Sequence, residues 1–163
     1  MVLDLSNAYQ LIRTGAVERN VRRIIWRWGD LDGEWEILAY DRVTFGDQIA
    51  ALLLELVKKA AAVHSVGIDP AAAGIILRHT YIDDTAGDGT NKEVTRFMRD
   101  EFPDGTYFGT IAHIFNLVGL KPKIMVRSGE SDQEKIKKMG KVLGHDWDPR
   151  ADTLTLMKIP VNL

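Results

Sequence analysis

The stretch Thr80-Tyr81-Ile82-Asp83-Asp84-Thr85 decides how we interpret the rest of the chain. Side chains alternate along a strand, so we expect Tyr81 and Asp83 on one face and Ile82 on the other, where it anchors the strand in the core. A tight turn at Asp83-Asp84 then brings two carboxylates to one exposed spot, where paired oxygen ligands suit Mg²⁺. A solvated Asp-Asp turn is the alternative, because Asp is common in turns simply through bonds to its own backbone.

Composition favours a single globular domain. The chain has 163 residues, of which 45% are hydrophobic, enough for one real core. Its 21 basic and 23 acidic residues nearly cancel, so the isolated chain has no electrostatic bias toward nucleic acid. The lack of cysteine excludes disulfides and thiolate metal sites and fits an intracellular protein. The longest apolar run, residues 49–54, is too short to span a bilayer, so we expect no membrane partner.

The first half of the chain predicts a strand, a hairpin and two helices. Residues 1–5 form the strand, and residues 22–28 and 34–40 form the hairpin. Asp47 is expected to cap a helix, and Asp69-Pro70 to start a shorter one. The apolar residues at helical spacing after Asp47 are Ile49, Leu52, Leu53, Leu56, Ala60 and Ala61. Residues of the hairpin able to contact nucleic acid, although solvated arginines are the simpler interpretation, are Arg22, Arg23, Trp26, Arg27 and Trp28.

The second half completes a fold of the α/β class, of α+β type. Thr90-Asn91-Lys92-Glu93 is a capping box that opens a helix with Phe97 and Met98 inward, and a helix over residues 111–118 ends at Gly119. The remaining elements are a strand over 121–127, a polar loop or short helix over 128–138, and a hairpin of strands over 141–147 and 153–159. We therefore expect an antiparallel sheet with helices packed on one face, followed by a C-terminal β-hairpin.

In this order, the motifs resemble the palm of a reverse transcriptase, most closely that of the Bel/Pao group of LTR retrotransposons. The three palm motifs are matched by Asp4-Leu5-Ser6-Asn7-Ala8-Tyr9, by Val43-Thr44-Phe45-Gly46-Asp47 and by the Tyr81-Ile82-Asp83-Asp84 turn. Residues 141–149, with Asp152-Thr153 following, are similar to the Bel/Pao segment after the palm. The resemblance thus divides the chain into a palm, residues 1–140, and a primer-grip-like hairpin, residues 141–163. We expect the fingers before Met1, and the thumb and ribonuclease H domain after Leu163.

The resemblance implies an RNA-directed DNA polymerase, which transfers a nucleotide from a deoxynucleoside triphosphate to a primer 3′-hydroxyl on an RNA or DNA template. It implies that Asp4, Asp83 and Asp84 are catalytic and hold two Mg²⁺ ions, with the Leu5 carbonyl as an added ligand and with Mn²⁺ able to substitute. Two such ions activate the attacking oxygen and stabilise the leaving pyrophosphate. Asp4 supplies the third carboxylate, since two are too few for two ions.

Further roles follow from motif position alone. Tyr9 is expected under the incoming sugar, where it excludes a 2′-hydroxyl. Either Lys121 or Lys123 is expected to protonate the leaving pyrophosphate as a general acid. The implied nucleotide-binding residues are Ala8, Tyr9, Phe45 and Gly46. The implied primer-binding residues are Tyr81, Val142, Leu143, Gly144 and His145.

An alternative from a different class is a retroelement remnant that folds as an inert palm and serves as a binding or scaffold module. The intact Asp4, Asp83 and Asp84 argue against long decay. One departure from the family pattern is Ile49, where a proline often follows the Phe-Gly turn. For the polymerase we expect a cytoplasmic location, within virus-like particles, and the rest of a polyprotein as partner. A nucleotide cyclase on a related topology is a further alternative, but the Tyr81 turn and Tyr9 suit template-directed synthesis better.

Overall fold

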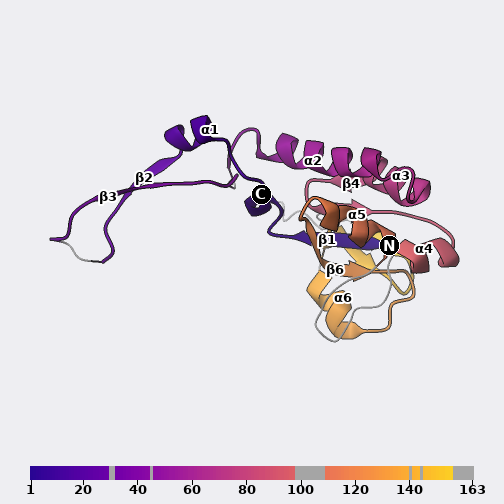
Figure 1. Ribbon diagram of the computed structural model, residues 1–163. Coiled ribbons are helices and arrows are strands. Elements are labelled where there is room, and N and C mark those ends of the chain that lie inside the picture. The colour runs from indigo at the N-terminus through magenta and orange to yellow at the C-terminus, as the bar shows by residue number, and fades with distance from the viewer. Residues whose placement is uncertain (30–31, 45, 98–108, 140, 144, 156–163) are drawn as a thin grey trace, which may run out of the picture. The chain divides into compact units, whose positions relative to one another are not determined.

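The computed structural model describes residues 1–29, 32–44, 46–97, 109–139, 141–143 and 145–155 (Figure 1). The chain divides into two compact units, Met1–Ser6 with Glu55–Leu163, and Asn7–Leu54. The described residues form six α-helices and three antiparallel sheets, so the predicted mixed α+β fold class is confirmed. Within these ranges, none of the helices combines the length and the apolar character needed to cross a bilayer.

The larger unit is built on a four-stranded sheet in the order β4-β5-β1-β6. Its strands are β1 (Val2–Ser6), β4 (Thr80–Tyr81), β5 (Asp84–Ala86) and β6 (Lys121–Val126). Leu3 lies opposite Thr85 on β5 and Met125 on β6, and all three are fully buried. Because side chains alternate along a strand, Asp4 projects from the other face of this sheet.

One irregularity interrupts the pairing of β1 with β6. Asp4 is paired with Ile124, but the next residue, Leu5, is paired with Pro122. The register therefore shifts between Asp4 and Leu5, and Lys123 is the extra residue of a β-bulge. Proline has no N–H group to give to a ladder, which makes Pro122 compatible with such a break.

Local capping signals fix two helices as predicted. Helix α3 (Pro70–Arg78) begins after Asp69, whose carboxylate accepts two backbone N–H groups of the first turn. Helix α4 (Asn91–Phe97) opens with the predicted capping box. The Thr90 amide donates to the Glu93 carboxylate at 2.9 Å, and the Glu93 amide donates back to the Thr90 hydroxyl at 3.3 Å. Met98 lies outside the described residues.

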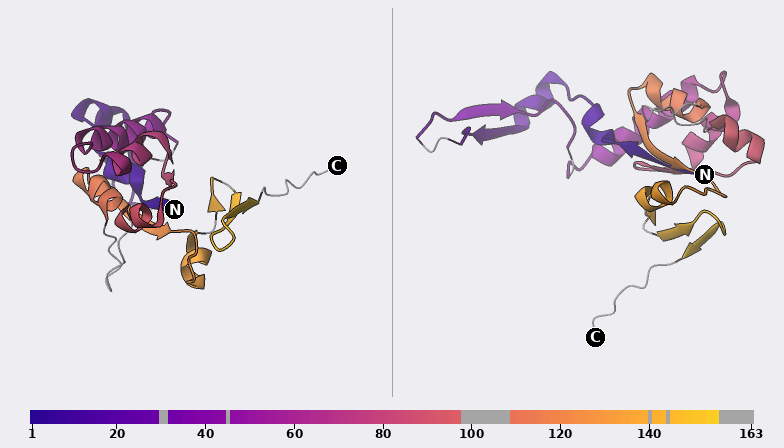
Figure 2. Two further views of the ribbon diagram at one scale, coloured as in Figure 1. Left: turned by 90° about the vertical axis from the view of Figure 1, so that its right-hand side faces the viewer. Right: turned by 90° about the horizontal axis from the view of Figure 1, so that it is seen from below.

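The next two helices flank β6 in sequence. Helix α5 (Thr110–Leu117) is followed by its C-cap Val118 and then by Gly119, whose φ of 76° suits a glycine after a helix, as predicted. The sequence predicted either a polar loop or a short helix over residues 128–138, and the structure has a short helix there, α6 (Gln133–Met139). Helix α3 contacts β4 and β5, whereas α6 contacts β6 at the other edge of the sheet (Figures 1 and 2).

The predicted C-terminal hairpin is a three-stranded antiparallel sheet. Its strands are β7 (Lys141–Val142), β8 (His145–Asp148) and β9 (Thr153–Thr155). The first predicted strand is divided because Leu143 adopts a left-handed φ of 49°, which a continuous strand does not allow. The part of the second predicted strand beyond Thr155 lies outside the described residues.

The unit Asn7–Leu54 contains the predicted hairpin and two short helices that were not predicted. Strands β2 (Arg23–Trp26) and β3 (Glu36–Ala39) pair in antiparallel fashion, which confirms the hairpin. A 3₁₀ helix, η1 (Ala8–Leu11), and helix α1 (Ala16–Val21) precede them. Helix α1 has no buried residue, and its six residues are too few to show the apolar periodicity on which a prediction depends.

Helix α2 (Ala50–His64) corrects two predictions. Asp47 is not its cap: the carboxylate instead accepts the Thr44 amide at 2.8 Å and pairs with Arg22. The buried face also differs from the predicted one. Leu56 and the other long apolar residues Ile49, Leu52 and Val63 are exposed, whereas the buried positions are Ala50, Leu54, Lys58, Ala61 and Ala62.

Candidate active site

The acidic turn lies one residue earlier than predicted. Tyr81 and Asp84 are paired as the ends of β4 and β5, so Ile82 and Asp83 form the two-residue turn between them. Ile82 has a φ of 51°, a left-handed value that a β-branched residue adopts rarely. The expectation that Ile82 anchors a strand in the core, with the turn at Asp83-Asp84, is therefore wrong. Positive φ values are what a tight two-residue hairpin turn requires.

The sheet brings Asp4, near the start of the chain, beside the acidic turn of Asp83 and Asp84. Asp4 on β1 lies directly opposite Asp84 on β5. The backbone amide of Leu5 donates to the carbonyl oxygen of Asp83 at 3.2 Å, which ties the turn to the end of β1. Residues opposite each other in an antiparallel pair have neighbouring side chains on the same face. Asp4 and the acidic turn thus form one cluster.

The electrostatics of Asp84 reflect this crowding. Burial raises the pKa of its carboxyl, and the nearby charges of Asp83 and Asp4 raise it further. A hydrogen bond from the backbone amide of Leu143, at 3.3 Å, opposes these effects on the pKa. Asp83 and Asp4 thus place two like charges near the carboxyl group of Asp84. A cation bound at this cluster would relieve their repulsion.

Lys123 is the predicted general acid that contacts the cluster. Its ammonium lies 2.9 Å from a carboxylate oxygen of Asp4, and this hydrogen bond together with the charge of Asp4 raises the pKa of Lys123. Lys121, the other candidate, is paired with Ser6 at the far end of the strand pair. The bulge at Lys123 explains the difference, because it turns this side chain to the face that carries Asp4.

The donors fit a hard divalent cation in their chemistry, since carboxylate oxygens are the ligands that Mg²⁺ prefers. In the part of the chain that the structure describes, however, no group of three or more His, Cys, Asp or Glu side chains is arranged to hold a metal ion. The carboxylate of Asp4 is engaged with Lys123, and that of Asp84 with the amide of Leu143.

The predicted primer-binding residues differ in their burial and in their contacts. Leu143 donates to Asp84, which puts the segment after β7 beside the acidic cluster. Val142 is buried, whereas Tyr81 is exposed. His145 is half-buried, and its Nδ1 atom has no hydrogen-bond partner within the described ranges. Gly144 lies outside the described residues.

The predicted nucleotide-binding residues belong to the other unit. Ala8 and Tyr9 are both buried in η1, which follows the left-handed residue Asn7. Gly46 has a φ of 89°, a conformation that glycine adopts without strain. Phe45 lies outside the described residues.

Sequence reasoning missed the ion pair that the buried Lys58 forms next to the acidic turn. The ammonium of Lys58, which is fully buried, lies 2.9 Å from a carboxylate oxygen of Glu55 and 2.5 Å from the carbonyl oxygen of Ile82. Burial lowers the pKa of Lys58, and the hydrogen bond and charge of Glu55 oppose that shift. The available signal was the position of Lys58 four residues after Leu54, on the same side of the helix.

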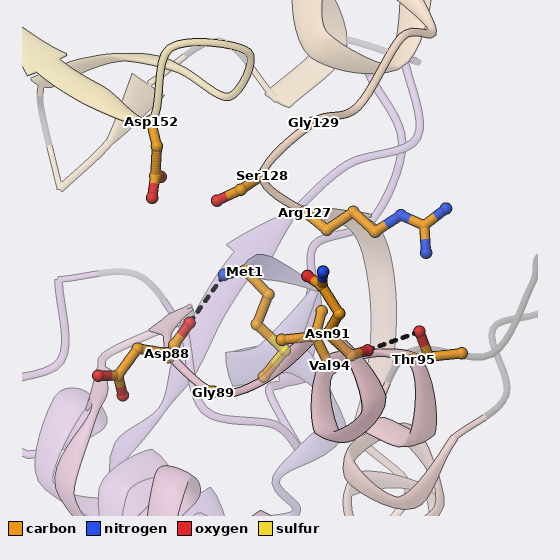
Figure 3. A pocket seen from close by; sticks show the side chains of 11 residues that line it. Met1, Asp88, Gly89, Asn91, Val94, Thr95, Arg127, Ser128, Gly129 and Asp152 are labelled. Carbon is orange, nitrogen blue, oxygen red and sulfur yellow. Dashed lines mark hydrogen bonds between the residues drawn. The ribbon is translucent and has the colours of Figure 1, made fainter.

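A separate cavity of about 470 Å³ lies at the Met1 end of the sheet. Figure 3 shows Arg127 and Ser128 from the segment after β6 facing Asn91 and Thr95 of α4 across it. The terminal ammonium of Met1 donates to the carbonyl oxygen of Gly87 at 2.7 Å within its wall. None of the predicted site residues lines this cavity, which is distinct from the acidic cluster.

Comparison with known proteins adds no relative. No protein-family model matches the chain, and no curated protein matches it in sequence.

Proposed function

We propose that this chain is the palm of an RNA-directed DNA polymerase of the Bel/Pao type, which joins a deoxynucleotide to a primer 3′-hydroxyl. The observation that carries the proposal is the register of β1 with β5, in which Asp4 lies opposite Asp84. A solvated Asp-Asp turn needs no third carboxylate across the sheet. The burial of residues 3–5 supports the same view, because Leu3 and Leu5 are buried while the Asp4 side chain keeps 22% of its surface exposed.

The division of labour follows from the contacts of each residue. Asp4, Asp83 and Asp84, with the Leu5 carbonyl, would hold the two Mg²⁺ or Mn²⁺ ions. When bound, these ions supply activation of the attacking oxygen and stabilisation of the leaving pyrophosphate. Lys123 is the better candidate for the general acid, because contact with Asp4 keeps its ammonium protonated and close to the cluster.

The primer end is proposed to bind at the segment that follows β7. The hydrogen bond from the Leu143 amide to Asp84 supports this role, since it joins that segment to a proposed metal ligand. Tyr81, which is exposed and paired with Asp84, would border the same place. Ala8, Tyr9 and Gly46 are proposed to contact the incoming nucleotide, on motif position alone.

Primer extension tests the proposal directly. The chain is given an RNA template, a labelled DNA primer, deoxynucleotides and Mg²⁺, and is compared with Asp83→Asn. We expect incorporation by the unchanged chain and none by Asp83→Asn, because that change removes one proposed ligand with little change of shape. Asp88→Asn is the matched control: it removes one carboxylate that lies outside the cluster and should leave incorporation intact. Measurable incorporation that is equal in Asp83→Asn and the unchanged chain would refute the proposal.

Metal affinity gives an independent measurement. Free Mn²⁺ has a strong electron paramagnetic resonance signal that decreases on binding, so titration yields a Kd without any need for turnover. We expect Asp83→Asn to weaken Mn²⁺ binding at least about 10-fold, and Asp88→Asn to leave it unchanged. Binding that depends on Asp83 in a chain that extends no primer would favour the inert palm, acting as a binding or scaffold module.

A further inference from the structure

Lys58 connects the buried side of α2 to the turn that carries Asp83. Its side chain has no exposed surface, yet its ammonium has two polar partners, the carboxylate of Glu55 on its own helix and the carbonyl of Ile82 in the turn. A buried charge is tolerated only when it is paired and hydrogen-bonded. One of the two groups that satisfy Lys58 is therefore part of the acidic turn itself.

The turn needs such support because Ile82 holds a conformation that its side chain disfavours. A β-branched residue with a φ of 51° persists only where its surroundings fix it. Two contacts fix the backbone here. Lys58 holds the Ile82 carbonyl, and the Leu5 amide holds the Asp83 carbonyl. The Ile82 carbonyl and the Asp83 amide belong to one planar peptide unit, so fixing one fixes the other.

We propose that Lys58 is a positioning residue, whose hydrogen bond to the Ile82 carbonyl orients the peptide that leads into Asp83 and so directs the acidic turn toward Asp4. This inference rests on the proposed function, because the orientation of the turn has a task only where its carboxylates bind metal. The charges of Lys58 and Asp83 also interact, but the proposed role depends on the hydrogen bond and not on that charge.

Lys59 offers a matched control within the same helix. Its ammonium also pairs with Glu55, at 3.3 Å, but its side chain is about half exposed. Lys59→Met and Lys58→Met therefore remove the same charge from adjacent residues that share an ionic partner. Of these two lysines, Lys58 is the one that donates to Ile82.

The first test is Mn²⁺ affinity, measured on the full chain by electron paramagnetic resonance. Loss of a positive charge near the carboxylates would by itself tighten cation binding, whereas loss of the correct turn geometry would weaken it. We expect Lys58→Met to raise the Kd for Mn²⁺ about 10-fold, and Lys59→Met to leave it unchanged or slightly lower. Unchanged or tighter binding by Lys58→Met would overturn the inference.

The second test is amide hydrogen exchange at Leu5, whose N–H group donates to the Asp83 carbonyl. We expect Leu5 to exchange about 10-fold faster in Lys58→Met, while amides of α5 keep their rates. An equal acceleration at both places would indicate a global loss of stability and would contradict a positioning role. Should Lys58→Met fail to fold, as judged by circular dichroism, Lys58→Gln replaces it, since its amide is polar but one bond too short to keep the contact.

The two proposals fail in different ways. If Asp83→Asn does not change Mn²⁺ affinity, the proposed function is contradicted, and exchange at Leu5 still decides whether Lys58 holds the turn. If Asp83→Asn weakens Mn²⁺ binding but Lys58→Met does not, the function stands and the positioning role is rejected.

Discussion

The ammonium of Lys123 lies 2.9 Å from a carboxylate oxygen of Asp4, so a lysine of β6 is already engaged with one of the proposed metal ligands. The pair is partly open to solvent, with the Lys123 side chain 62% exposed. A contact of this kind is weak and exchangeable. The proposed metal binding at Asp4 and the proposed proton donation by Lys123 would therefore be linked, because both involve the two members of this pair.

Replacement of Lys123 should affect metal binding and turnover in opposite directions. Lys123→Met frees the Asp4 carboxylate and removes a competing cation, so we expect Mn²⁺ to bind about 2- to 5-fold more tightly, the range of an exposed ion pair. Primer extension should become slower because the proposed general acid is lost. Lys121→Met is the control and should leave both unchanged. A larger loss of extension in Lys121→Met would assign the general acid to Lys121 instead.

Asp69 should be a major contributor to stability. It is buried, caps α3 and pairs with Arg96, whose Nε lies 2.8 Å from its carboxylate. We expect Asp69→Ala to lower the free energy of unfolding by about 2–4 kcal/mol, measured by urea denaturation, since both cap and ion pair are lost. Asp69→Asn keeps an acceptor for the cap and should lose less. Equal stability of Asp69→Ala and the unchanged chain would show that the cap contributes nothing.

The corrected buried face of α2 can be tested with two leucines. Leu54 is fully buried and Leu56 is 55% exposed. We expect Leu54→Ala to lower the free energy of unfolding by about 2–5 kcal/mol, because it leaves a cavity. Leu56→Ala should change it by less than about 0.5 kcal/mol. The reverse order, in the same urea titration, would restore the face predicted from the sequence.

Glu93 should give a stability that depends on pH. The backbone amide of Thr90, and then its hydroxyl, hold the pKa of Glu93 below its ordinary value of 4.5. A carboxyl group with a lowered pKa in the folded chain stabilises it above the unfolded pKa, and this contribution disappears as pH falls through the folded pKa. Glu93→Gln keeps an acceptor oxygen without the charge. We expect its Tm to lie below that of the unchanged chain near neutral pH, with the difference vanishing in acid.

Elements with a local signal were predictable. The cap at Asp69, the capping box at Thr90 and the glycine after α5 each combine a residue type with the backbone geometry that it satisfies, and all three are confirmed. The buried face of α2 was not predictable, because apolar residues occur on several sides of this helix and only tertiary contacts decide which side is buried. Asp47 likewise matched a capping pattern, but its carboxylate is engaged with Arg22 and Thr44.

The candidate site, too, was predictable from the sequence only in part. The resemblance identified Asp4, Asp83 and Asp84 as a set, and the register of β1 with β5 brings Asp4 opposite Asp84. The exact turn position escaped prediction because a left-handed isoleucine is rare, and Lys58 escaped because consecutive lysines suggest a solvated surface. The choice between Lys121 and Lys123 depended on a bulge for which the sequence carries no clear sign.

That bulge makes the number of residues in β6 as important as their identity. With regular pairing Lys123 would be opposite Leu5 and would share the face of the fully buried Leu3 and Met125, where an ammonium has no aqueous surroundings. The single extra residue reverses the direction of its side chain. Shortening the strand by one position, for example by deletion of Pro122, would remove the lysine from the carboxylates without altering any side chain in the cluster. Insertions and deletions, rather than substitutions, would then be the quickest route by which such a site is gained or lost.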